Sequence, residues 1–152
     1  MSEGWKAYLD ANVFIDAIEG GEEVASPARR LLDAGRSTTG LLVTSELTLA
    51  EVLGPGRHRS MSEDVKLTYL DLIISSGIVE LNPVSRAILM ETARLRRLTR
   101  LKLIDAIHFA TAVRANCRFL VSRDRDFSAS PDGIETVTAQ ADALRDAIER
   151  LT

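Results

Sequence analysis

Short apolar runs alternate with helical patterns along almost the whole of this 152-residue chain. An apolar run of about four residues, followed by amphipathic helical spacing and then by another apolar run, is typical of parallel strands joined by crossover helices. Parallel strands are normally buried on both faces. The alternation therefore predicts an α/β fold in which helices cover both faces of a central parallel sheet.

The expected elements follow from these runs and from their capping and turn residues. Strands are expected at 7–10, 41–43, 78–81, 119–122 and 134–137, and helices at 12–19, 26–32, 44–53, 60–76, 87–98, 103–116 and 139–151. Ser26 and Pro27 predict the start of one helix and Gly35 its end. Ser60 and Glu63 have the spacing of a capping box at the start of another.

The composition is that of a soluble globular protein, with 45% hydrophobic and 27% charged residues. The length is that of one ordinary domain, so we expect a single domain over residues 1–152. The net charge of −3 gives no overall basic signature, which weakens a nucleic-acid partner without excluding it. Because Cys117 is the only cysteine, a reducing compartment is expected. No apolar run approaches the length of a membrane helix, so we expect a cytoplasmic protein with no membrane association.

Four acidic residues stand where the chain is expected to pass from strand to helix. Asp10 and Asp124 follow apolar runs, whereas Glu51 and Asp105 lie on expected helices. Open parallel sheets bind ligands in the crevice beyond the carboxyl ends of their strands, so all four side chains are predicted to face one crevice. The prediction depends on the combination, because a single acid at such a place is most often a helix cap or a favourable partner of the helix dipole.

Several carboxylates in one crevice favour a bound cation. Two like charges about 4 Å apart repel by roughly 4 kcal/mol at an effective dielectric of 20. Such a cluster takes up protons or binds cations. Oxygen-only ligands favour Mg²⁺ or Mn²⁺ over zinc, and Mg²⁺ is commonly bound together with phosphate oxygens. We therefore expect phosphodiester cleavage, in which the metal ion activates a water molecule and neutralises the leaving oxygen.

Four segments resemble, in the same order, the four motifs of PIN-domain nucleases. These segments are 8–16, 44–53, 101–112 and 119–127. The length of the chain and its third segment most resemble the VapC-type toxins of bacterial toxin–antitoxin pairs. The resemblance implies a three-layer α/β/α sandwich around a parallel sheet. It also implies an endoribonuclease that depends on Mg²⁺ or Mn²⁺.

The resemblance assigns site roles to seven residues. The catalytic and metal-binding positions are Asp10, Glu51, Asp105 and Asp124, and the supporting positions are Asn12, Ser122 and Asp126. Ser122 stands where threonine is common in the family, and the hydroxyl is retained. Ile104 stands where proline often precedes the third acid, which leaves the start of that helix and the direction of Asp105 open.

Three further residues are candidate contacts to substrate or partner. Arg123 and Arg125 flank the fourth acid. His108 lies three residues after Asp105, on the same face of the expected helix. A buried, hydrogen-bonded histidine is the more common role at such a position.

The resemblance to VapC-type toxins also implies partners. They are RNA as the substrate, a small cognate antitoxin protein and a second copy of the chain in a homodimer. Leu67, Leu70 and Ile74, in the expected helix around 62–76, are candidates for either protein interface. Core packing explains these three residues equally well.

Two other functions remain open at this point. A PIN-like fold that acts in binding without catalysis has the same pattern, although all four acids are present. A phosphatase like the haloacid dehalogenases also begins with an acid after a strand. That class needs a second acid two residues later as its general acid, and this chain has Asn12 there.

Overall fold

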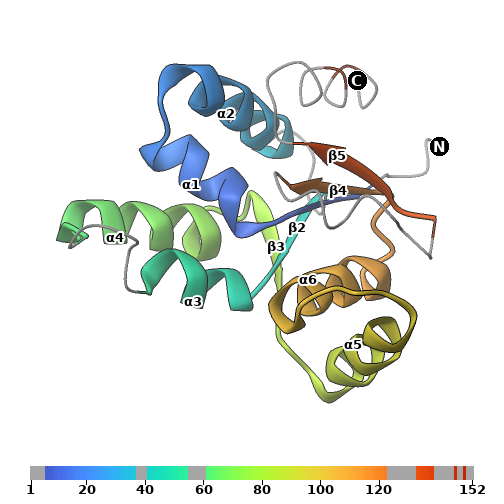
Figure 1. Cartoon of the computed structure of the whole chain (residues 1–152). Coiled ribbons are helices and arrows are strands. Elements are labelled where there is room, and N and C mark those ends of the chain that lie inside the picture. The colour runs from blue at the N-terminus through green and yellow to red at the C-terminus, as the bar shows by residue number, and fades with distance from the viewer. Residues whose placement is uncertain are drawn as a thin grey trace.

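A parallel sheet forms the centre of the molecule. The computed structural model describes residues 6–36, 41–54, 61–122 and 133–138, together with residues 146 and 149. Within these ranges the five strands have the order β3-β2-β1-β4-β5, and all neighbours are parallel (Figure 1). The strands are β1 Ala7–Leu9, β2 Leu42–Ser45, β3 Val79–Asn82, β4 Phe119–Ser122 and β5 Glu135–Thr138. The predicted strands are confirmed, with ends that shift by one or two residues.

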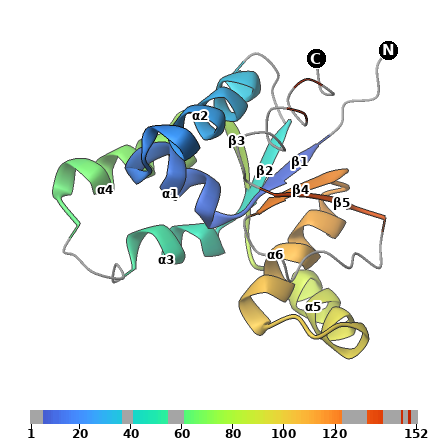
Figure 2. The same cartoon turned by 45° about the horizontal axis from the view of Figure 1, so that its top comes forward.

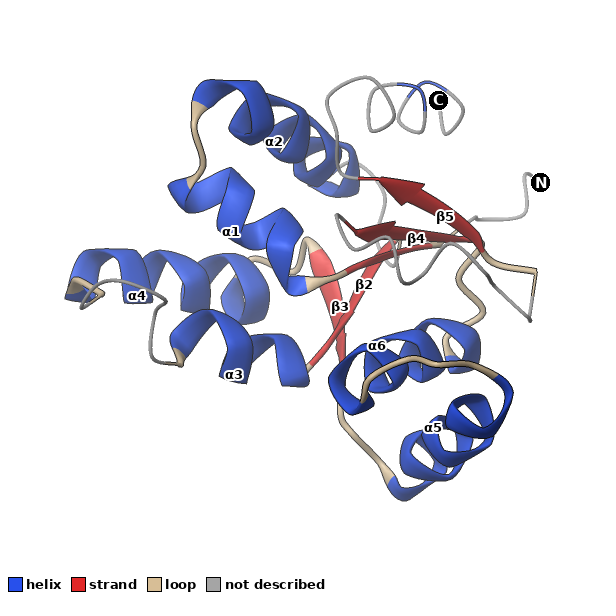
Figure 3. Ribbon diagram, viewed as in Figure 1, coloured by secondary structure: helices blue, strands red, loops and turns tan. Residues whose placement is uncertain are grey.

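Helices cover both faces of this sheet. They are α1 Ala11–Glu19, α2 Glu22–Arg36, α3 Leu47–Leu53, α4 Glu63–Leu70, the π-helix η1 Asp71–Ser75, α5 Arg86–Leu98 and α6 Leu103–Arg114. In both views α1 to α4 lie on one side of the sheet, and α5 and α6 lie on the other (Figures 1 and 2). Figure 3 shows the same arrangement as two blue helical layers around the red strands. The predicted three-layer α/β/α sandwich is confirmed.

Alternate residues of the strands fill two separate cores. Ala7 and Leu9 of β1 pack with the buried residues of α1, α2 and α4, whereas Tyr8 packs with those of α5 and α6. In β4, Val121 belongs to the first core and Leu120 to the second. This period of two follows from the pleat of a strand, which directs successive side chains to opposite faces. Each strand therefore contributes to both layers.

Parallel pairing places the carboxyl ends of the strands at one edge of the sheet. Leu9 is in register with Val121, and the backbone N–H of Asp10 donates to the carbonyl of Val121 over 3.3 Å. The end of β1 therefore lies beside the end of β4, where Ser122 stands. The next strand on the other side of β1 ends at Ser45. The carboxyl ends of β1, β2 and β4 are thus brought together.

Helix α2 differs from the prediction at both ends. It begins at Glu22, contains Pro27 and continues past Gly35. The carbonyl of Gly21 accepts the backbone N–H groups of Val24 at 3.1 Å and Ala25 at 2.9 Å, so the first turn forms before the proline. Pro27 then removes one hydrogen bond from the second turn only. Local turn signals were outweighed here by the apolar helix face that packs on the sheet.

Gly35 has a packing role inside α2. A Cβ atom added there would lie 2.4 Å from Cδ1 and 2.9 Å from Cγ of Leu42. Leu42 is fully buried in β2, so its side chain has little space in which to move. The glycine therefore permits α2 to approach the sheet closely, which explains why it stands within a helix.

The helix before β3 also differs in detail. The Oγ atom of Ser62 accepts the backbone N–H of Val65 at 3.2 Å, so the N-cap is Ser62 and the prediction of Ser60 is wrong. Ser62 directly precedes the first helical residue, where a hydroxyl reaches the N–H three residues on. The predicted helix at 139–151 lies outside the described residues, except for the helical residues 146 and 149. No helix in the described ranges has the length and apolar character needed to span a membrane.

The substitution Gly35→Ala is expected to destabilise the protein by about 1–3 kcal/mol, because the added methyl group forces the buried Leu42 out of position. The free energy of unfolding in urea measures this effect. Gly21→Ala is the matched control, because a Cβ atom at Gly21 has no heavy atom within 4 Å. Equal stability of wild type and Gly35→Ala would show that α2 does not need this close approach.

Candidate active site at the carboxyl ends of the strands

Asp10 occupies the junction between β1 and α1. It is the N-cap of α1, and its Oδ1 atom accepts the backbone N–H of Asn12 at 3.0 Å. The hydroxyl of Ser122, at the end of β4, donates to its Oδ2 atom. Only 6% of Asp10 is exposed. A carboxylate this deeply buried needs such partners, and both come from residues that the sequence predicted to support it.

Glu51 reaches the same region from α3. Its Oε1 atom forms a hydrogen bond with Nε2 of His108, which belongs to α6. The Glu51 side chain is 30% exposed and that of His108 is 3% exposed. The ring of His108 is held on its other side by the hydroxyl of Tyr8, through Nδ1. His108 is therefore the predicted buried, hydrogen-bonded histidine, and one of its partners is a predicted site acid.

The electrostatics of Asp10 link these groups. Burial raises the pKa of the Asp10 carboxyl above its usual value, and the negative charge of Glu51 adds to this rise. The hydrogen bond from Ser122, the electrostatic interaction with His108 and the N–H of Asn12 act in the opposite direction and lower the pKa. Burial is the largest of these causes. Glu51 and His108 thus both influence Asp10 electrostatically, although the three residues come from different elements.

Of the remaining predicted site residues, the structure describes Asp105 but not the four that follow Ser122 in the sequence. Asp105 is half-buried in the first turn of α6, one turn before His108. The helix begins at Leu103 even without a proline at the position before the third acid. Four predicted residues lie outside the described residues: Arg123, Asp124, Arg125 and Asp126. Their positions in the site stay predictions.

The donor chemistry of the described acids suits a hard divalent cation. Asp10 and Glu51 offer carboxylate oxygens, which are the ligands that Mg²⁺ and Mn²⁺ prefer. A cation between them would offset the burial of Asp10 and the repulsion from Glu51. In the described part of the chain, no group of three or more histidine, cysteine, aspartate or glutamate residues is arranged to hold a metal ion. The described acids therefore fit such an ion in kind.

Tyr8 is a site residue that the sequence pattern did not reveal. Tyr8 lies in the apolar run before Asp10, and its ring is fully buried. The same side chain also contacts the ring of His108 edge to face, with centroids 5.7 Å apart. Burial raises the pKa of the Tyr8 hydroxyl well above its usual value, so this group keeps its proton. The polar end of Tyr8 next to a buried histidine becomes visible only in the folded chain.

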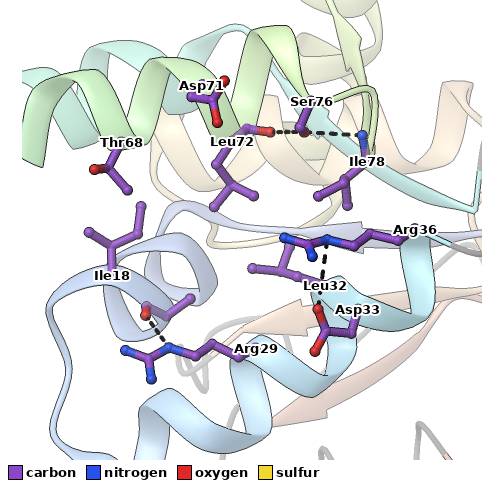
Figure 4. Close-up of a pocket in the computed structure, with 11 residues that line it drawn as sticks. Ile18, Arg29, Leu32, Asp33, Arg36, Thr68, Asp71, Leu72, Ser76 and Ile78 are labelled. Carbon is purple, nitrogen blue, oxygen red and sulfur yellow. Dashed lines mark hydrogen bonds and ion pairs between the residues drawn. The ribbon is translucent and has the colours of Figure 1, made fainter.

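A cavity of about 240 Å³ lies away from these acids, between α1, α2 and the helix that continues into η1. Figure 4 shows Arg29 and Arg36 on the side of α2, facing Asp71 and Ser76 across the cavity. Ile78, which precedes β3, also lines it. The cavity is thus at the amino end of β3 and includes none of the predicted site residues.

Comparison with protein families gives a match to the PIN domain over residues 7–132. No curated protein sequence matches the chain significantly. The solved structures that resemble it include a toxin–antitoxin complex from Klebsiella pneumoniae, with 24% identity and a TM-score of 0.64, covering 88% of this chain and 98% of the other.

Two other similar structures have related descriptions. VapBC2 from Rickettsia felis, bound to a DNA fragment of its promoter, has 19% identity and a TM-score of 0.66, with 87% of this chain and 97% of the other covered. VapC20 from Mycobacterium tuberculosis, a toxin that cleaves the sarcin–ricin loop, has 17% identity and a TM-score of 0.62, with 84% and 96% covered. At these identities the likeness establishes a shared fold.

In the presence of a chelator, Asp10→Asn is expected to unfold at a higher urea concentration than the wild type at pH 7. Burial raises the folded-state pKa of Asp10, so the folded protein binds more protons than the unfolded chain between the two pKa values. The ionised side chain therefore destabilises the fold at neutral pH. Asparagine removes the charge and still caps the helix.

The advantage of Asp10→Asn is expected to shrink as pH falls through the folded-state pKa of Asp10 toward its usual value of 3.8. Urea unfolding at several pH values between 7 and 4 measures it. Asp33→Asn is the matched control, because the Asp33 side chain is 66% exposed and such a change has little effect. A lower urea midpoint for Asp10→Asn at pH 7 would contradict the electrostatic description of the site.

Proposed function

This chain belongs to the PIN domain family, and from that premise we propose that it is a divalent-metal-dependent endoribonuclease, the toxin of a VapBC-type toxin–antitoxin pair. The observation that carries the proposal is the buried carboxylate of Asp10 at the end of the central strand, within the electrostatic influence of Glu51 and His108. The match to the PIN domain covers most of the chain, so we also propose a single domain over residues 1–152.

The metal ligands in this proposal are Asp10, Glu51, Asp105 and Asp124. Mg²⁺ or Mn²⁺, when bound, supplies an activated water molecule and neutralises the charge that develops on the phosphodiester. The protein residues keep the ligands in place. Ser122 and Asn12 hold the two oxygens of Asp10, and His108 holds one oxygen of Glu51. Because these contacts exist before substrate arrives, little reorganisation is needed when the ligands act.

RNA as the substrate is supported by the charge near α6. Arg97, Arg100 and Lys102 are all exposed, at the end of α5 and in the loop that leads to Asp105. The sequence has no acidic residue between Glu91 and Asp105. Cations next to an acidic site attract the phosphates that flank the cleaved bond, although the whole chain has a net charge of −3. This local charge favours a polyanion over a small neutral substrate.

The proposal includes protein partners. Structures of similar fold are described as toxin–antitoxin complexes, and we infer that this chain also pairs with a small antitoxin in the cytoplasm and forms a homodimer. Leu67 and Ile74 are 59% and 52% exposed, on α4 and η1. Exposed leucine and isoleucine side chains on one helical segment are consistent with an interface. Leu70, between them, is half-buried and belongs partly to the fold itself.

Purified protein is expected to cleave RNA from a total-RNA pool with Mg²⁺ or Mn²⁺ and to lose this activity with a chelator. Asp10→Asn and Asp105→Asn are expected to lower the rate by about 100-fold or more, because each removes a charged ligand worth several kcal/mol to the transition state. Asp33→Asn, on the exposed face of α2, is the control and should cleave at the wild-type rate. Cleavage that persists both with the chelator and in the two site variants would reject the metal-dependent mechanism.

Expression in a bacterial host separates the toxin function from the catalytic chemistry. The wild-type chain is expected to arrest growth, and Asp10→Asn is expected to permit growth at an equal level of folded protein. Growth arrest by both proteins would indicate that the chain acts by binding, as in a PIN fold without catalysis. If the wild-type protein cleaves RNA but does not arrest growth, the toxin function is rejected and the nuclease function stands.

A further inference from the structure

Tyr8, His108 and Glu51 form a chain of hydrogen bonds that leads from the core to the acidic site. The hydroxyl of Tyr8 contacts Nδ1 of His108, and Nε2 of the same ring contacts Oε1 of Glu51. The three residues belong to β1, α6 and α3. Exposure increases along the chain, since Tyr8 has 0% and His108 2% of their surface exposed, whereas the Glu51 side chain has 30%.

The hydrogen bonds determine where the protons are. A carboxylate oxygen only accepts, so Nε2 of His108 carries the hydrogen that is shared with Glu51. In the neutral ring Nδ1 is then an acceptor, and the Tyr8 hydroxyl donates to it. The Tyr8 hydroxyl is fully buried beside this ring, where Nδ1 of His108 is its partner. Tyr8 thereby selects the tautomer of His108 that presents N–H to Glu51.

Glu51 requires such a contact more than Asp10 does. Asp10 is short and buried, and hydrogen bonds hold both of its oxygens. Glu51 has a longer side chain on an exposed face of the seven-residue helix α3. Holding a glutamate side chain in one conformation costs up to about 2 kcal/mol of entropy. Among the described residues, His108 is the hydrogen-bond partner of Glu51, and it contacts only Oε1.

We propose that His108 is a positioning residue for Glu51, held in the required tautomer by Tyr8, and that it leaves Oε2 of Glu51 available to the metal ion at the acidic site. This inference rests on the proposed function and assigns to His108 a role beyond core packing. A histidine needed only for packing would have both ring nitrogens satisfied within the core. Here one nitrogen bonds to the core and the other to a half-exposed acid.

The position of the Tyr8 ring supports this assignment. The Tyr8 ring is fully buried in the core that β1 forms with α5 and α6. The rings of Tyr8 and His108 meet at an angle of 61°. The imidazole is therefore fixed relative to β1, the strand that precedes Asp10. Through its contact with His108, the Glu51 side chain on the short helix α3 is held in a fixed position relative to the sheet.

The test is the affinity of the RNA-free protein for Mn²⁺, measured by electron paramagnetic resonance. His108→Leu is expected to weaken Mn²⁺ binding by about 10-fold or more, since loss of an outer-shell hydrogen bond typically costs 10–100-fold. His108→Gln, which keeps an N–H donor, is expected to recover much of this loss. Tyr8→Phe is expected to weaken binding by a smaller factor, because it leaves the ring in place but removes the donor to Nδ1.

A double-mutant cycle shows whether His108 acts through Glu51. In a Glu51→Ala background, His108→Leu is expected to change Mn²⁺ affinity by less than about twofold. Urea unfolding with a chelator establishes that each variant is folded. If His108→Leu does not fold, His108→Gln and Tyr8→Phe provide the test, and wild-type affinity in both would overturn the proposal.

The outcomes separate this inference from the proposed function. Wild-type Mn²⁺ affinity in folded His108→Leu, or an equal loss with and without Glu51, would overturn the positioning role while the nuclease function stands. If the wild-type protein itself neither binds Mn²⁺ nor cleaves RNA, the proposed function fails and the positioning role fails with it.

Discussion

The burial of the Asp10 carboxylate at the end of the central strand is the constraint on which the rest of the site depends. A charged group removed from water costs several kcal/mol unless hydrogen bonds or charges replace the lost solvation. Two of the replacements are the hydroxyl of Ser122 and the backbone N–H of Asn12. One comes from the neighbouring strand β4 and the other from the first turn of α1. Hydrogen bonds to the same Asp10 carboxylate therefore connect β1 to β4 and to the start of α1.

The alternation of side chains along β1 connects this charge to both helical layers. Leu9 packs with α1 and α2, whereas Tyr8 faces α6 and contacts His108. Through His108 the layer of α5 and α6 reaches Glu51, which stands on a helix of the other layer. Glu51 and His108 thus meet although their helices cover opposite faces of the sheet. This contact lies close enough to Asp10 for both residues to affect its pKa.

The sequence predicted the parts of the molecule in which local pattern and tertiary packing agree. The strands and α6 were recognisable because their apolar residues are buried in the way that their spacing indicates. Pro27 and Gly35 were misleading, because both residues normally mark the ends of a helix and here lie inside α2. At Gly35, the absence of a side chain lets α2 approach Leu42 of β2 closely. No local sequence signal reveals such a contact between distant segments.

The candidate site was predictable in its residue types but not in its contacts. Asp10 and Ser122 each follow from the end of a predicted strand, and the register of β1 with β4 brings them together. The pairing of Glu51 with His108, 57 residues later, depends on how two helices pack on opposite faces of the sheet. The contact of Tyr8 with His108 could not be predicted, because an aromatic residue in an apolar run gives no sign of which polar group its hydroxyl will meet.

The most direct test of the metal-dependent site is an anomalous difference map from a crystal of the wild-type protein grown with Mn²⁺. The arrangement of Asp10 and Glu51 predicts a strong peak in contact with carboxylate oxygens of both residues, and no such peak in Asp10→Asn. A map without density beside Asp10, or with Mn²⁺ bound only at other acidic residues of the surface, would contradict the account.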